Sequence, residues 1–116
     1  MKVTRVWEDA EGVSHFGEME VPLRDAGDIG RLSELLPAAG VIFRETGGDY
    51  DFDWHRAPRR QYVVLLDGEI EIEVGDGETR RFRGGEILLV EDTTGRGHRT
   101  RSVDGRLRRS LFIALE

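Results

Sequence analysis

Hydrophobic and polar positions alternate with a period of two along much of the chain, as they do in half-buried β-strands. The clearest case is residues 69–74, EIEIEV, where three apolar side chains share one face and three glutamates the other. Similar patterns predict further strands at residues 1–7, 14–23, 41–46, 61–66, 79–82, 87–90, 98–103 and 107–115. Glycine- and aspartate-rich turns separate these strands, and Asp67-Gly68 is interpreted as a hairpin turn. The pattern therefore predicts an all-β chain.

Residues 28–36 are the one segment with helical spacing. Asp28 is placed to cap such a helix, and Pro37 to end it. We therefore expect an N-terminal extension over residues 1–38, made of edge strands and this short helix, followed by a barrel over residues 39–116. Many short strands with regular turns favour a barrel or sandwich, and a barrel removes its free edges by closure. A plain β-sandwich without a ligand pocket is the alternative.

Composition narrows the class of protein. A chain of 116 residues is long enough for one domain with a single core. It has no apolar run of the ~18 residues that a membrane helix needs and no leader-like start, so we expect neither membrane insertion nor secretion. The absence of cysteine excludes disulfides and thiolate chemistry and fits a cytoplasmic location. A formal charge of −6 argues against a nucleic-acid partner.

The candidate chemistry lies in residues 51–68 and around His98. Counting by two from His55 places it on the same face as Gln61 and Val63 in an unbroken strand. Because Val63 should face the core, His55 and Gln61 should face inward as well. Two such polar groups on an inner face predict a polar pocket at one end of the barrel. Asp92-Thr93-Thr94 is interpreted as turn chemistry only.

These residues and their spacing resemble the small single-domain cupins. That family has a first motif of a glycine, H-x-H-x3-E, six residues and a glycine, and a second motif G-x5-P-x-G-x2-H-x3-N. The matching positions over residues 48–103 are His55, Gln61, Gly68, Gly85, Gly95 and His98. The resemblance implies a double-stranded β-helix, or jelly-roll, barrel.

The motifs are incomplete. Ala57 stands at the second histidine, Gln61 at the glutamate, Glu91 at the proline and Ser102 at the asparagine, and the loop before His98 is two residues longer. The resemblance implies a site of three histidines and one glutamate, of which this chain keeps two histidines and a neutral amide.

From the resemblance we expect His55, Gln61 and His98 to be the metal ligands, with His55 and His98 also the catalytic candidates. Imidazole ligands suit Zn, Fe, Ni or Cu, and Mn is a further candidate. Affinity should fall below that of the complete motif because no ligand is negatively charged. A third strong ligand would have to come from His15, Glu45 or Asp53. A metal-free protein is the alternative.

Arginines near both histidines suggest an anionic ligand, because guanidinium groups match carboxylates and phosphates. Arg59, in register with Gln61, and Arg99, next to His98, are predicted to bind substrate, with Trp54 at the pocket mouth. For each arginine, and for Trp54, an ordinary surface or packing role is the alternative.

Three hypotheses about function follow. The first is a metal-dependent enzyme of oxygenase, isomerase or lyase type that acts on a small, possibly charged molecule. The second is a metal-free enzyme in which a pocket histidine is the general acid or base. The third is a non-catalytic small-molecule binding module. Exposed strand edges and the apolar residues Trp7, Phe16 and Phe112 further predict a homodimer.

Overall fold

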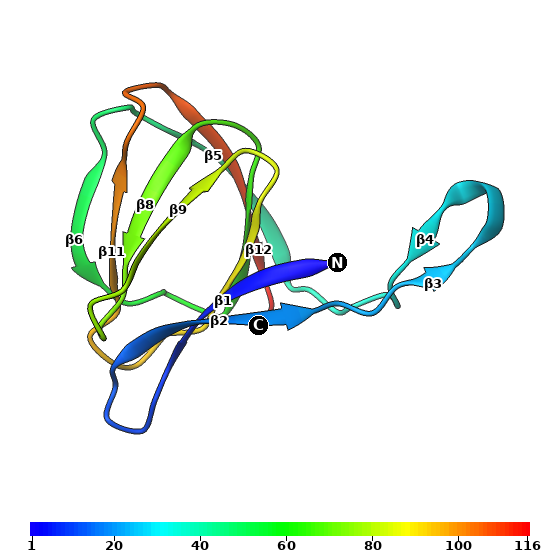
Figure 1. Cartoon of the computed structure of the whole chain (residues 1–116), viewed down its shortest axis with the longest axis horizontal. Helices are drawn as coiled ribbons and strands as arrows, with labels where there is room; N and C mark the ends of the chain where they lie inside the picture. The colour runs from blue at the N-terminus through cyan, green and yellow to red at the C-terminus, as the bar shows by residue number, and fades with distance from the viewer.

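The computed structural model describes residues 1–116 and shows an all-β protein built from two main sheets (Figure 1). The six-stranded sheet has the order β2 (Ser14–Glu20), β1 (Lys2–Glu8), β10 (Ile87–Val90), β7 (Gln61–Leu65), β12 (Arg108–Ala114) and β5 (Gly40–Thr46). The four-stranded sheet has the order β6 (Asp51–His55), β11 (His98–Ser102), β8 (Glu69–Glu73) and β9 (Thr79–Arg83).

The two sheets do not close into a barrel. The larger sheet is mixed, because β1 runs parallel to β10 whereas all other neighbouring strands in this sheet pair antiparallel. Strands β2 and β5 are its edges, and β6 and β9 are the edges of the smaller sheet. Free edges thus remain where the sequence had predicted closure. Strand β2 lies at an edge, as predicted.

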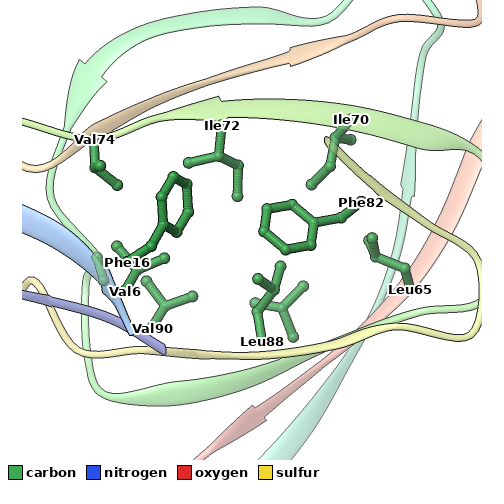
Figure 2. Packing of buried hydrophobic residues seen from close by; sticks show 11 residues of the cluster. Val6, Phe16, Leu65, Ile70, Ile72, Val74, Phe82, Leu88 and Val90 are labelled. Carbon is green, nitrogen blue, oxygen red and sulfur yellow. The ribbon is translucent and has the colours of Figure 1, made fainter. Parts of the chain in front are cut away.

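The alternation of apolar and polar residues is confirmed by burial. Ile70 and Ile72 of β8 are each 3% exposed, and the glutamates between them face outward. They belong to a cluster of eleven buried apolar residues between the two sheets (Figure 2). Figure 2 shows Ile70 and Ile72 of β8, and Val74 just beyond the strand, facing the rings of Phe16 and Phe82. This packing fixes how the sheets face one another.

The predicted helix over residues 28–36 is wrong. Gly27–Ile29 is a single 3-10 turn (η1), and Arg31–Leu32 is a short strand, β4, paired with β3 (Arg24–Asp25). Gly27 and Gly30 have φ angles of 67° and 97°, which are incompatible with a continuous α-helix. The apolar side chains have nothing to pack against, because every residue from 24 to 43 is exposed. The segment forms an arm that projects from the sheets (Figure 1).

The prediction that Asp67-Gly68 joins two strands of a hairpin is also wrong. Strands β7 and β8 on its two sides belong to different sheets, so the turn carries the chain from one sheet to the other. Gly68 has a φ of 75°, the left-handed conformation that a tight turn requires. The Asp67 carboxylate accepts hydrogen bonds from the backbone N–H and the Nε of Arg109 on β12, at 2.6 and 2.7 Å. This anchors the turn to the larger sheet.

No helix in the structure has the length and apolar character needed to cross a membrane.

Candidate functional site

A cavity of about 390 Å³ lies between the sheets, bordered by β5, β7, β10 and β12 of the larger sheet and by β6, β8 and β11 of the smaller. This volume falls within the range of small-molecule pockets. Of the 21 residues that line it, 11 are hydrophobic, and the polar remainder includes His55, His98 and Gln61. The cavity therefore contains every residue that the sequence predicted as a metal ligand.

His55 and His98 face each other across neighbouring strands of the smaller sheet. They are directly paired between β6 and β11, and their ring centroids are 4.6 Å apart. The next pair along is Phe52 with Thr100, so Asp53 and Trp54 together lie opposite one residue in a β-bulge. The bulge brings both Phe52 and His55 to the cavity, where their ring centroids are 4.0 Å apart.

Gly97 permits this close approach of the two strands. It has a φ of 82°, and a Cβ atom at this position would overlap the carbonyl group of His55. The fully buried Ser14 donates a hydrogen bond from Oγ to the Gly97 carbonyl at 2.7 Å. The start of β11, and with it His98, is held in place from the core side.

Each imidazole is oriented by an acceptor at Nδ1. His98 Nδ1 lies 2.6 Å from Oδ2 of Asp92, which is fully buried. His55 Nδ1 lies 2.8 Å from the backbone carbonyl of Asp53. Because a carbonyl only accepts, Nδ1 of His55 carries the hydrogen, and Nε2 carries the lone pair. The Asp92 carboxylate likewise accepts a hydrogen bond from Nδ1 of His98.

The surroundings of His55 favour the neutral form of its ring. Burial lowers its pKa below the ordinary histidine value, the hydrogen bond to Asp53 opposes this shift, and the neighbouring His98 lowers the pKa further. A neutral imidazole offers its Nε2 lone pair to a metal ion or to a proton.

Gln61 reaches the cavity from the opposite sheet. Strand β6 ends at His55 and β7 begins at Gln61, so the unbroken strand assumed for the two residues is wrong. Gln61 is 4% exposed, and its Oε1 is buried without a hydrogen-bond partner. A buried amide oxygen of this kind normally has a partner, so Gln61 has acceptor capacity to spare.

His55, His98 and Gln61 are the side chains of the cavity that could contribute ligands to a metal ion. Metal-binding histidines usually donate their second ring N–H to a carboxylate or carbonyl, as both imidazoles do here. The Oε1 atom of Gln61, which accepts no hydrogen bond, is a third candidate ligand atom. None of the three carries a negative charge, and no group of three or more His, Cys, Asp or Glu side chains is arranged to hold a metal ion. The affinity for a divalent cation should be correspondingly low.

The expected third strong ligand is not supplied by His15, Glu45 or Asp53, none of which lines the cavity. His15 on β2 lies between Asp9, 2.7 Å from Nε2, and Asp76, 2.8 Å from Nδ1. The Asp53 side chain is 86% exposed, and Glu45 faces solvent.

The predicted substrate-binding residues divide into two groups. Arg59 lines the cavity, whereas Trp54 and Arg99 lie outside it. The guanidinium of Arg96 covers the Trp54 ring, 5.5 Å from its centroid. Arg99 is held on the outer surface by ion pairs to Asp53 at 3.5 Å and Glu73 at 3.6 Å.

Sequence reasoning missed three polar residues. Asp92 had been interpreted as a turn residue, and nothing in its spacing to His98 indicates the hydrogen bond between them. Arg44 and Arg108 line the cavity on β5 and β12. No sequence pattern marked either one: Val41, Ile42 and Phe43 are consecutive apolar residues before Arg44, and Arg108 does not share the parity of the apolar Leu111 and Ile113.

The chain is similar to a curated fungal protein and to a solved bacterial structure. No family model matches the chain. It is 25% identical over 126 residues to Oryzines biosynthesis cluster protein J of Aspergillus oryzae, covering 95% of this chain and 69% of that protein. Protein NMB1881 from Neisseria meningitidis, solved as a crystal structure, has a TM-score of 0.52 and 23% identity, covering 72% of this chain and 81% of that one. The latter likeness is one of fold alone.

Proposed function

We propose that this chain is a small cupin-type enzyme that acts on a small molecule in the cavity, with His55 and His98 as its reacting centre. In this proposal the two sheets are those of a double-stranded β-helix. The observation that carries it is the pair of rings 4.6 Å apart, each held through Nδ1, which leaves both Nε2 atoms available on rings that line the cavity.

In the first form of the proposal, His55, His98 and Gln61 hold a divalent transition metal (Zn, Fe, Mn, Ni or Cu). When bound, such an ion polarises a substrate oxygen as a Lewis acid. The contribution of the chain is orientation: Asp92 fixes the His98 ring, and the Asp53 carbonyl fixes the His55 ring. The apolar walls limit the access of water and strengthen polar interactions within the cavity.

The similarity to the Aspergillus oryzae protein supports a role in small-molecule chemistry, because that protein's name places it in a biosynthesis cluster. Oxygenation, isomerisation and lyase-type proton transfer are the reaction classes that we propose.

A second form needs no metal and is favoured by the buried Asp92–His98 pair. A carboxylate at Nδ1 orients an imidazole and stabilises its protonated form while Nε2 exchanges a proton with substrate. His98 would then be the general acid or base in proton transfer at a carbon next to a carbonyl group. The third possibility is a binding module that uses the same cavity without turnover.

Metal analysis distinguishes these forms. We expect untagged protein, purified from metal-supplemented cells, to carry a transition metal that His98→Ala and His55→Ala both lose. His15→Ala is the matched control, since His15 lies outside the cavity, and it should retain the metal.

A metal-free wild type whose proton-transfer activity on carbonyl substrates disappears in His98→Ala would replace the first form by the second. Absence of both metal and turnover, with thermal stabilisation by ligands retained, would leave only the binding module.

We further propose that the chain is a cytoplasmic homodimer, although not through Phe16, which is buried in the core, or Phe112, which lines the cavity. The arm (residues 24–39) exposes Ile29 and Leu35 at 73% and 99%, and the neighbouring edge strand β5 exposes Phe43 at 80%. An apolar arm and an unpaired strand edge on one chain are complementary to the same features of a second copy. Light scattering on the full chain measures the mass directly.

A further inference from the structure

The cavity has a charge opposite to that of the chain. Four arginines line it and no aspartate or glutamate does, although the chain has 23 acidic and 17 basic side chains. Acidic partners are plentiful on the outer surface, where Glu71 alone pairs with Arg81 and Arg101. The positive lining is therefore a property of the cavity and not of the composition.

Two of these arginines, Arg44 and Arg108, converge at one place. They lie on paired strands, with Arg44 opposite Ser110 and Arg108 opposite Thr46, so they are diagonal neighbours on the inner face. Both guanidinium groups pack over one ring: the Cζ atoms of Arg44 and Arg108 are 5.5 and 5.4 Å from the centroid of Tyr50.

Neither of the two guanidinium groups pairs with a carboxylate of the chain. Arg108 is 6% exposed, and its guanidinium makes one side-chain hydrogen bond, from Nη1 to Ser102 Oγ at 3.3 Å. Burial and the neighbouring charge of Arg44 lower the pKa of Arg108. A guanidinium has five N–H donors, and a buried charge is normally paired. The chain thus leaves two adjacent cations without an ion-paired carboxylate, and Asp104 acts on the charge of Arg108 without forming an ion pair with it.

The surroundings favour an organic anion over a bare inorganic ion. The Arg44 guanidinium also lies over Phe112, 5.1 Å from its ring centroid, and Ile42 lines the same wall. A ligand with a charged head and a carbon skeleton would contact both the guanidinium groups and these apolar side chains.

We propose that Arg44 and Arg108 form an oxyanion subsite, and that the molecule bound in the cavity is a small organic anion with a carboxylate or phosphate head. The paired forks bind the head, and the carbon skeleton extends along the apolar walls toward His55 and His98. This inference rests on the proposed function, because it names the substrate class of the same cavity.

The test is an NMR titration of the metal-stripped full chain with benzoate, phenyl phosphate and the neutral benzamide. We expect saturable shifts of the Arg44 and Arg108 Nε–Hε signals with at least one anion, and none with benzamide. The stronger of the two anions identifies the head group. Arg108→Leu should weaken that anion's binding at least tenfold.

Arg44→Leu, at a less buried position, should give the same weakening and guards against misfolding of the Arg108 variant. Arg99→Leu, outside the cavity, is the matched control and should bind as the wild type does. Equal binding of benzamide, unchanged affinity in both cavity variants, or no saturable shift with either anion would overturn the proposal.

This titration uses metal-stripped protein and measures no turnover. Its result therefore does not depend on whether His55 and His98 form a reacting centre. If anions bind at the arginines but His98→Ala changes neither metal content nor turnover, the enzyme proposal is contradicted and the anion subsite is supported. Metal bound by His55 and His98 without anion binding would do the reverse.

Discussion

The two ends of the cavity are built on opposite principles. At the histidine end, His55 and His98 are each held by an acceptor that the chain supplies. At the arginine end, Arg44 and Arg108 have no carboxylate partner and share only the Tyr50 ring. Strand β11 connects the ends: it begins at His98, and its last residue, Ser102, accepts the hydrogen bond of Arg108, about 13 Å further along the strand.

The histidine end thus orients its own side chains, whereas the arginine end is suited to recognising a ligand. Rings that are already hydrogen-bonded need no rearrangement before they react, which is the condition for preorganised catalysis. Unpaired cations gain their counter-charge only from a bound ligand, so they favour the complex over the free protein. The histidine end should therefore contribute to folding, and the arginine end should lower the stability of the free protein.

The largest expected effect concerns Asp92. Asp92→Ala leaves the His98 Nδ1–H without its buried partner and should lower the free energy of unfolding by about 2–3 kcal/mol. Arg108→Leu, which removes an unpaired buried charge, should leave that free energy unchanged or raise it. Denaturant unfolding of the ligand-free variants measures both values.

Asp92→Asn is the matched control, because its amide oxygen retains an acceptor for Nδ1 and should preserve most of the stability. Equal losses in Asp92→Ala and Arg108→Leu would contradict the contrast between the two ends.

A smaller effect is expected at Gln61. Gln61→Glu adds the negative donor that this site lacks and should raise the affinity for Zn²⁺ by about tenfold, or ~1.4 kcal/mol. The same carboxylate supplies a counter-charge inside the cavity and should weaken benzoate binding. Competition with a chromophoric chelator gives the first quantity, and NMR titration gives the second.

Gln61→Leu is the comparison variant. It removes the unpartnered Oε1 and should increase stability modestly while decreasing Zn²⁺ affinity. A Gln61→Glu protein with unaltered Zn²⁺ affinity would show that residue 61 is not a ligand.

The smallest effect is a pH dependence remote from the cavity. Hydrogen bonds to Asp9 and Asp76 raise the pKa of His15. The hydrogen bond with His15 lowers the pKa of Asp9, and the pKa of Asp76 is lowered mainly by the backbone N–H of Glu78 and further by His15. A raised histidine pKa stabilises the fold fully below the unfolded value of about 6.5, and this contribution disappears as pH rises through the folded-state pKa. His15→Gln should therefore lower the Tm more at pH 6 than at pH 9.

Metal and anion binding should not change in His15→Gln, since His15 does not line the cavity. A Tm difference that is constant from pH 6 to pH 9 would mean that the His15 contacts contribute nothing through its charge.

Local patterns predicted the strands well and their connections poorly. The period of two over residues 69–74 fixed which side chains of β8 are buried, because a strand exposes alternate residues to opposite faces. The same reasoning failed at Asp67-Gly68, because a turn sequence sets the local backbone and not the sheet that receives the next strand. The helix over 28–36 failed because its apolar spacing had no tertiary surface to cover.

The sequence by itself determined the all-β class, most strands of the two sheets and the inward position of Gln61, since these follow from local alternation. Strand β6 was not predicted, and the unbroken strand from which the position of His55 was inferred does not exist, although His55 and His98 do line the cavity. Only the tertiary structure decided that His55 and Gln61 come from opposite sheets, that Asp92 holds His98, and that Arg44 and Arg108 share one end of the cavity. Those contacts join residues far apart in the chain or across loops, where no period relates them. Their geometry depends on how the two sheets pack.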